Sequence, residues 1–161
     1  MLLFFILNSA SQFNIDQNIP ESYNLVKVKR KAVTKGASAK LPKKFNIHFY
    51  KSDAGREPVK EYLEKLKQSK NIQDQKLLLE IITYITLLSE RGSNLGIPYV
   101  KHLRDELWEL RPKNDRIIYC SVEGNNIYLL HNFKKTSQKT PLKEIKTALQ
   151  RYKKLVKSTM R

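Results

Sequence analysis

The chain has 161 residues, of which 40% are hydrophobic and 29% charged, and this composition predicts one soluble globular domain with a real core. The formal net charge of +16 indicates a polyanionic partner such as nucleic acid, a ribosome or an anionic membrane, without indicating a mechanism. One cysteine and three scattered histidines exclude an intrachain disulfide and any metal site of familiar ligand spacing, and they fit an intracellular location.

The first 43 residues are expected to be a disordered basic extension, followed by one folded domain over residues 44–161. The apolar start at residues 1–7 is shorter than a transmembrane helix and lacks the basic start of a secretory signal, so membrane targeting is the minor alternative. The basic residues of the 43-residue extension are Lys27, Lys29, Arg30, Lys31, Lys35, Lys40 and Lys43. This extension either touches RNA electrostatically or is a solvated tail without a role.

Two helices are predicted to follow a first strand. Residues 46–50 are rich in aromatic and branched side chains, which predicts the strand. Pro58 suits the first position of an amphipathic helix. A second helix is expected to start after Asn71, with Asp74 placed for a capping interaction, and to stop at Gly92.

The hydrophobic pattern then changes from helical to strand-like. Residues 107–111, 116–122 and 127–133 are short runs with strand-like composition. Strong turn signals separate them at residues 112–115 and 123–126. Two successive hairpins of this kind predict an antiparallel meander.

A last helix is predicted to close the chain, with Thr140 as its cap and Pro141 as its first residue. The element order is then strand, helix, helix, three strands and helix. This order predicts an α+β fold in which a small antiparallel twisted sheet has its helices packed on one face.

The meander predicts which side chains share a face of the sheet. If each hairpin has a four-residue loop, Arg111 pairs with Arg116 and Val122 with Ile127, and paired residues point to the same face. The face covered by helices would contain Trp108, Leu110, Ile117, Tyr119, Tyr128 and Leu130. The other face would contain Arg111, Arg116, Ile118, Cys120, Leu129, His131 and Phe133. Cys120 is expected to be a small core residue, and a one-residue slip would scatter the whole cluster.

The candidate catalytic residues are Arg111, Arg116, His131, Lys134 and Lys135, which suit RNA cleavage without a metal ion. Such cleavage requires activation of the ribose 2′-hydroxyl, stabilisation of the extra charge on the phosphorane and protonation of the leaving 5′-oxygen. Arginines clamp phosphate oxygens and stay charged, whereas histidine and lysine can move protons. The simpler alternatives are exposed arginines beside a turn, a core histidine and a solvated lysine pair.

The end of the chain is strongly basic. From His131 to Arg161, ten lysines and arginines stand against a single acid, Glu144. Within this stretch, Lys139 and Lys143 are candidate RNA-binding residues. A plain RNA-binding surface would have the same charge, so the charge does not separate an enzyme from a binding module.

Four short motifs together resemble a known family. They are VKHLRDELWELR at residues 100–111, RIIY at 116–119, LLHNFKKT at 129–136 and KTP at 139–141. In this order and at this spacing they resemble the HigB-like, phage-derived branch of the RelE/ParE toxin superfamily. The resemblance covers roughly residues 45–157.

The resemblance implies a toxin of a type II toxin–antitoxin system, with a helix-turn-helix antitoxin as its partner. It implies a cytoplasmic, ribosome-dependent endoribonuclease that cuts mRNA in the A site with basic residues and neither metal nor cofactor. Arg111, Arg116, Lys134 and Lys135 match the family's basic site residues best. His131 and the RNA-binding candidate Lys101 match less closely, and the RNA-binding candidate His102 matches less closely again.

Two alternatives stay open from the sequence. ParE-like relatives poison DNA gyrase and cut no RNA, so membership of the superfamily supports the fold better than the activity. A basic RNA-binding module without catalysis is the other alternative, and its affinity would fall steeply with salt.

Overall fold

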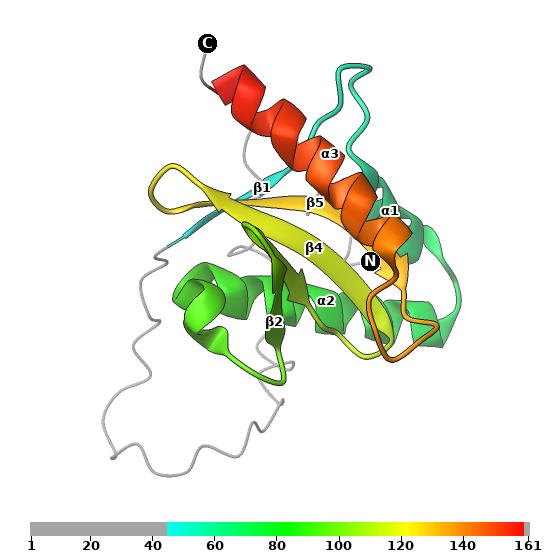
Figure 1. Ribbon diagram of the computed structural model, residues 1–161. Helices are drawn as coiled ribbons and strands as arrows, with labels where there is room; N and C mark the ends of the chain where they lie inside the picture. The colour runs from blue at the N-terminus through cyan, green and yellow to red at the C-terminus, as the bar shows by residue number, and fades with distance from the viewer. Residues whose placement is uncertain (1–44, 160–161) are drawn as a thin grey trace, which may run out of the picture. The chain divides into compact units, whose positions relative to one another are not determined.

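The computed structural model describes residues 45–159, which form an α+β fold with one five-stranded sheet and three α-helices (Figure 1). The predicted extension over residues 1–43 lies outside the described residues. In chain order the elements are β1 (Asn46–Phe49), α1 (Pro58–Gln68), α2 (Ile72–Arg91), the short 3-10 helix η3 (Gly92–Leu95), β2 (Val100–Arg104), β3 (Leu107–Leu110), β4 (Asp115–Val122), β5 (Asn126–Lys134) and α3 (Leu142–Thr159). None of the helices in this part of the chain has the length and apolar character needed to span a membrane.

The sheet has the strand order β1-β5-β4-β3-β2 and is mixed, which corrects the predicted antiparallel sheet. Strands β2 to β5 form the expected antiparallel meander, but β1 lies parallel to β5, with Asn46 opposite Asn126. Two helices separate β1 from the meander, and a crossover of that length allows parallel pairing. The sequence pattern of β1 predicts a strand but contains no signal for its direction.

Strand β2 has no counterpart among the predicted strands. Its residues Lys101, His102 and Arg104 are exposed, and only Val100 is fully buried. It lies at the edge of the sheet and pairs only with β3. Edge strands are often short and charged because they need no apolar alternation, and this explains why the hydrophobic pattern misses it.

Helices cover both faces of the sheet, which corrects the prediction of helices on one face (Figure 1). On one face, Ile118, Cys120 and Leu130 form a buried cluster with Ala148 of α3. On the other face, the hydroxyl of Tyr62 from α1 donates to Asp115 at 2.6 Å. The first six residues of β4 are all buried, and a strand that is buried on both faces needs cover on both.

The register of the meander is correct at one end and shifted at the other. Ile118 lies opposite His131, as the four-residue loop predicts, but Tyr119 lies opposite Leu129. The β4–β5 loop has three residues, 123–125, rather than the predicted four. Leu130 is an extra residue in β5 that forms a β-bulge, and beyond it the pairing returns to the predicted register. The predicted faces of Tyr128, Leu129 and Leu130 are therefore wrong, since Tyr128 and Leu130 pack on the α3 side.

The helix ends follow their predicted signals in part. Pro58 is the first residue of α1, and the side chain of Asn71 accepts a hydrogen bond from the backbone of Gln73 at the start of α2. Asp74 accepts from the hydroxyl of Ser69 at 2.6 Å, so it ties the chain before the helix to its first turn.

Cys120 is fully buried, as expected, and this burial raises the pKa of its thiol to about 12.

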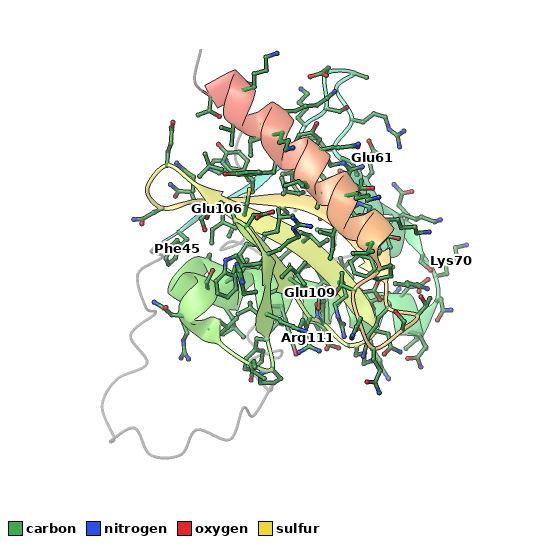
Figure 2. All side chains as sticks on the ribbon, viewed as in Figure 1. Phe45, Glu61, Lys70, Glu106, Glu109 and Arg111 are labelled. Carbon is green, nitrogen blue, oxygen red and sulfur yellow. The ribbon has the colours of Figure 1, made fainter. Side chains whose placement is uncertain are left out.

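Gly92 ends α2 at a position that a larger residue cannot occupy without strain. Its φ is +56°, and a Cβ atom added there would lie 2.6 Å from the ring of Phe45, which precedes β1 (Figure 2). We predict that Gly92→Ala lowers the free energy of unfolding by about 3 kcal/mol, from left-handed strain together with overpacking.

The matched control is Gly124→Ala, because Gly124 has φ +66° but no atom within 4 Å of the added Cβ. Strain alone should cost this variant about 1 kcal/mol. Urea unfolding of both full-length variants measures the difference, and equal losses would contradict a role for the contact with Phe45.

Candidate active site

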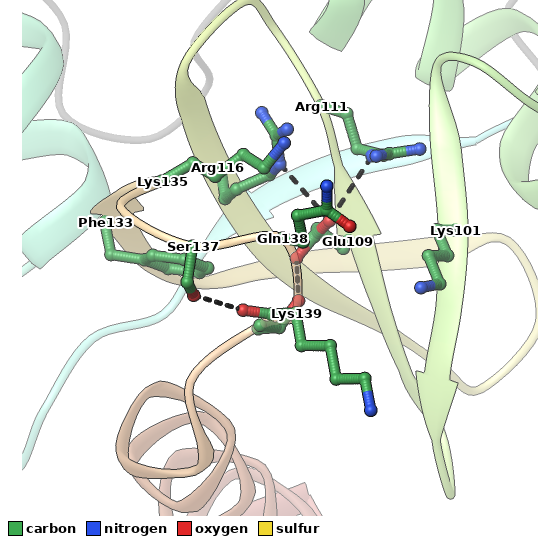
Figure 3. Close-up of a pocket in the computed structure, with 10 residues that line it drawn as sticks. Lys101, Glu109, Arg111, Arg116, Phe133, Lys135, Ser137, Gln138 and Lys139 are labelled. Atoms are coloured by element: carbon green, nitrogen blue, oxygen red, sulfur yellow. Dashed lines mark hydrogen bonds and ion pairs between the residues drawn. The ribbon is translucent and has the colours of Figure 1, made fainter.

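A pocket lies at the end of the sheet where the β3–β4 turn meets the loop between β5 and α3 (Figure 3). Its lining residues are Lys101, Glu109, Arg111, Arg116, Phe133, Lys135, Ser137, Gln138, Lys139 and Thr140. Five of these residues are cationic and one is acidic. The pairings Lys101–Glu109, Glu109–Ile118 and Arg116–Phe133 place its strand residues on the face that α3 covers.

Glu109 of β3 is the centre of the pocket. Its side chain is 4% exposed, and its Oε1 atom lies 3.3 Å from Nε of Arg116 and 3.4 Å from Nε of Arg111. Its Oε2 atom accepts a hydrogen bond from the hydroxyl of Thr140 at 2.5 Å. Both carboxylate oxygens are thus engaged, and the two arginines lie on either side of this acid (Figure 3).

Arg116 is buried, with only 5% of its surface exposed. Its Nη1 atom donates to the backbone carbonyls of Lys113 at 2.8 Å and Asp115 at 2.6 Å. Burial lowers the pKa of Arg116, and the charge of Glu109 opposes this effect. A guanidinium starts from so high a pKa that it remains charged, so Arg116 is a fixed cation with a fixed orientation.

The turn that holds Arg116 is itself braced by α1 and α2. The backbone N–H of Lys113 donates to Oε1 of Glu80 in α2 at 3.0 Å. Tyr62 of α1 donates to the side chain of Asp115. Lys113 has a φ of +40°, an unusual conformation that turns its carbonyl toward the guanidinium of Arg116.

Arg111 is the more accessible of the two arginines, with 27% of its side chain exposed. Its backbone N–H donates to the carbonyl of Tyr99 at 2.9 Å, which extends the β2–β3 pairing by one residue. Within residues 45–159 its guanidinium has the ion pair with Glu109 and no hydrogen bond, and its Nε atom is buried. Its remaining N–H groups are available to an anion in the pocket.

The arrangement suits the binding of a phosphate group. Arginine presents paired N–H donors that match phosphate oxygens, and Lys101, Lys135 and Lys139 add charge around the same pocket. Among the described residues, no group of three His, Cys, Asp or Glu side chains is placed to hold a metal ion. The chemistry that these residues can provide is anion binding and charge stabilisation.

The predicted site residue His131 lies outside the pocket lining and under α3. Its Nε2 atom lies 2.6 Å from Oε2 of Glu144, and its Nδ1 atom lies 3.1 Å from Nη1 of Arg151. A guanidinium can only donate, so Nδ1 accepts and the proton of the neutral ring lies on Nε2, where it is donated to Glu144. Both partners belong to α3, so His131 connects this helix to β5.

Three other predicted residues also lie outside the pocket lining. Lys134 lies opposite Asp115, on the face away from the pocket, whereas its neighbour Lys135 lines the pocket. His102 contacts the ring of Trp108, and its Nε2 atom donates to the carbonyl of Asp105 at 2.8 Å. Lys143 is 84% exposed and lies 3.6 Å from Glu144. The structure therefore brings together Arg111, Arg116, Lys101, Lys135 and Lys139.

Sequence reasoning missed Glu109 and Thr140. Glu109 alternates with Arg111 along β3, so their shared face could have been predicted from the period of a strand. The bond to Thr140 joins residues 31 positions apart, and no local pattern predicts it. Thr140 is the predicted helix cap, but its hydroxyl bonds Glu109 and α3 begins at Leu142.

A family model described as phage derived protein Gp49-like (DUF891) matches residues 61–153, more than half of the chain. The matched residues include every residue that lines the pocket. They also include His131 and both of its α3 partners, and they leave out β1. No curated protein matches the chain.

The contacts of His131 predict how stability depends on pH. Burial lowers the pKa of His131 below its ordinary value of 6.5, although the bond to Glu144 opposes the shift. The unfolded chain then binds a proton more readily than the folded chain, so stability falls as the pH drops through about 6.5 toward the folded pKa. We predict a pKa below 6.5 for His131 in an NMR titration.

The matched variant is His131→Gln, because glutamine can accept from Arg151 and donate to Glu144 without titrating. Urea unfolding between pH 5.5 and 7.5 should show a smaller loss of stability on acidification for this variant than for the unaltered chain. An equal loss would mean that other groups cause the acid sensitivity.

Proposed function

Because the chain belongs to the Gp49-like family of phage-derived proteins, a family of RelE-like toxins of toxin–antitoxin systems, we propose that it is a ribosome-dependent mRNA endonuclease. The observation that carries this proposal is the recessed pair of arginines, Arg111 and Arg116, in a pocket with three lysines. We place the protein in the HigB-like branch on its LWELR and LLHNFKKT motifs. We assign the toxin domain to residues 44–161.

In the proposed reaction the 2′-oxygen of a ribose attacks the adjacent phosphorus, and the bond from phosphorus to the 5′-oxygen breaks. The pocket would hold the phosphate that is attacked, with Arg111 and Arg116 stabilising the charge that builds on its oxygens. Arginine stays charged and is a poor base. The lysines of the pocket are its candidates for proton transfer, Lys135 first among them because it directly follows β5.

The family implies an antitoxin partner, and we propose a helix-turn-helix protein with an acidic surface that covers the pocket. The chain has a net charge of +16, so an acidic partner would bind it with electrostatic steering. Covering Arg111 would block RNA and neutralise the exposed cations at once. The ribosome and mRNA are the proposed targets in the cytoplasm.

We predict that brief induction of the chain in cells cuts a translated message and leaves an untranslated copy intact, when 5′ ends are mapped. Arg111→Ala should lower the cutting by about 100-fold or more, because it removes a donor to the phosphorane. Arg111 is preferred to Arg116 for this test, because Arg116 is buried and its replacement would also lower the stability of the fold.

The matched control is Arg104→Ala, which removes an exposed arginine of the same sheet that is ion-paired with Asp105 at 3.0 Å. Its cutting should stay within a few-fold of the unaltered chain. Cuts in both message copies would indicate a ribonuclease that needs no ribosome. Intact RNA in arrested cells would replace the proposal with a gyrase-directed or other non-nuclease toxin.

The neighbours Lys134 and Lys135 allow a second prediction. Lys135→Ala should lower single-turnover cleavage by at least about tenfold, since Lys135 lines the pocket and can supply charge or a proton. Lys134→Ala removes the same charge one residue away, on the opposite face, and should change cleavage by less than about threefold. Equal effects of the two variants would mean that only the total charge matters.

A further inference from the structure

We propose that Glu109 is a positioning residue, which orients Arg111 and Arg116 for the phosphate and weakens the binding of that phosphate at the same time. This inference rests on the proposed function, since it concerns the same pocket. The observation behind it is one buried carboxylate shared by two guanidiniums and a hydroxyl, all within 3.4 Å.

Glu109 is placed to orient other groups and not to take part in proton transfer. Its Oε1 atom faces both Nε atoms, and its Oε2 atom accepts the short bond from Thr140. Both oxygens already face protein groups and the side chain is only 4% exposed, so a substrate hydroxyl has little access to this carboxylate. A carboxylate that faces Nε favours one orientation of each guanidinium. The Nη atoms of Arg111 are then left for another anion, whereas Nη1 of Arg116 already donates to the carbonyls of Lys113 and Asp115.

Stability alone does not explain a carboxylate at this position. A buried ion pair is often no more stabilising than apolar residues of the same size, because both charges lose their hydration. A negative charge at the base of a cationic pocket also repels the phosphate that the pocket would bind. Glu109 therefore costs affinity, and orientation of the two arginines is the gain that balances this cost.

Through Thr140, Glu109 also positions the loop between β5 and α3. Its hydroxyl bonds Glu109, and its neighbour Lys139 lines the pocket. Ser137 donates to the carbonyl of Lys139 at 2.7 Å, which tightens this loop. The carboxylate thus fixes both the arginines beneath the phosphate and the loop that holds Lys139.

The decisive variant is Glu109→Gln, which keeps the shape and removes the charge. We expect it to bind a 2′-O-methyl oligonucleotide, which cannot be cleaved, a few-fold more tightly than the unaltered chain does. Single-turnover cleavage of a ribosome-bound message should fall about 100-fold, as for a misplaced catalytic group. Binding and cleavage would thus change in opposite directions, which a loss of folding cannot produce.

The matched control is Glu106→Gln, because Glu106 is exposed and lies at the other end of the same hairpin (Figure 2). It removes the same charge away from the arginines and should leave cleavage unchanged. Thr140→Val is a second variant, which keeps the shape of the side chain and loses the hydroxyl. It should reduce cleavage by about tenfold with little change in oligonucleotide binding.

A spectroscopic measurement tests Glu109 without any cleavage assay. In the unaltered chain the Nε–H signals of Arg111 and Arg116 should be protected from exchange with water and should shift on titration with inorganic phosphate. Glu109→Gln should remove the protection while phosphate still binds. Protection that survives the substitution would overturn the positioning role.

The outcomes separate this inference from the proposed function. If the unaltered chain cuts no message, the nuclease proposal fails, and the Nε–H signals with phosphate still decide the role of Glu109. If Glu109→Gln cleaves like the unaltered chain, the positioning role is wrong and the nuclease stands. If this variant loses binding, cleavage and thermal stability together, Glu109 is only part of the scaffold.

Discussion

The buried charge of Arg116 is the constraint on which the rest of the site depends. A guanidinium with 5% exposure is very costly unless its N–H groups are paired. Its partners are two carbonyls of the β3–β4 turn and the carboxylate of Glu109. Other elements hold these partners in place: Glu80 of α2 and Tyr62 of α1 hold the turn, and Thr140 before α3 holds Glu109.

The helices on the two faces of the sheet therefore both help to hold the candidate site in place. Helices α1 and α2 brace the turn from one face, while α3 is tied to β5 on the other face by His131, Glu144 and Arg151. Arg151 also donates to the carbonyl of Leu130, the bulged residue. The loop that contains Lys135 and Lys139 is therefore anchored at both ends, by β5 and by α3, next to the fixed arginines.

The sequence predicts the three helices, four of the five strands and the pairing of β3 with β4, because strand period and turn signals are local, but it does not predict the edge strand β2. It could not predict the bulge at Leu130, since two compensating changes, a shorter loop and an extra residue, leave the hydrophobic pattern intact. His131 was assigned to the correct face, but its partners in α3 are 13 and 20 residues away. The separation of Lys134 from Lys135 depends on where β5 ends, which is the least certain part of any pattern.

The chain belongs to a family of RelE-like toxins, and the pocket is the reason to propose catalysis and not simple binding. A surface that only binds RNA works with exposed lysines, which keep their hydration and lose little entropy. Here one arginine is buried and the other partly buried, and both lie beside a carboxylate that opposes anion binding. Such preorganisation weakens ground-state binding and favours a state with more charge on phosphorus. The lysines of helix α3 can supply affinity for RNA outside the pocket, so the pocket itself need not bind the ground state tightly and can favour the transition state.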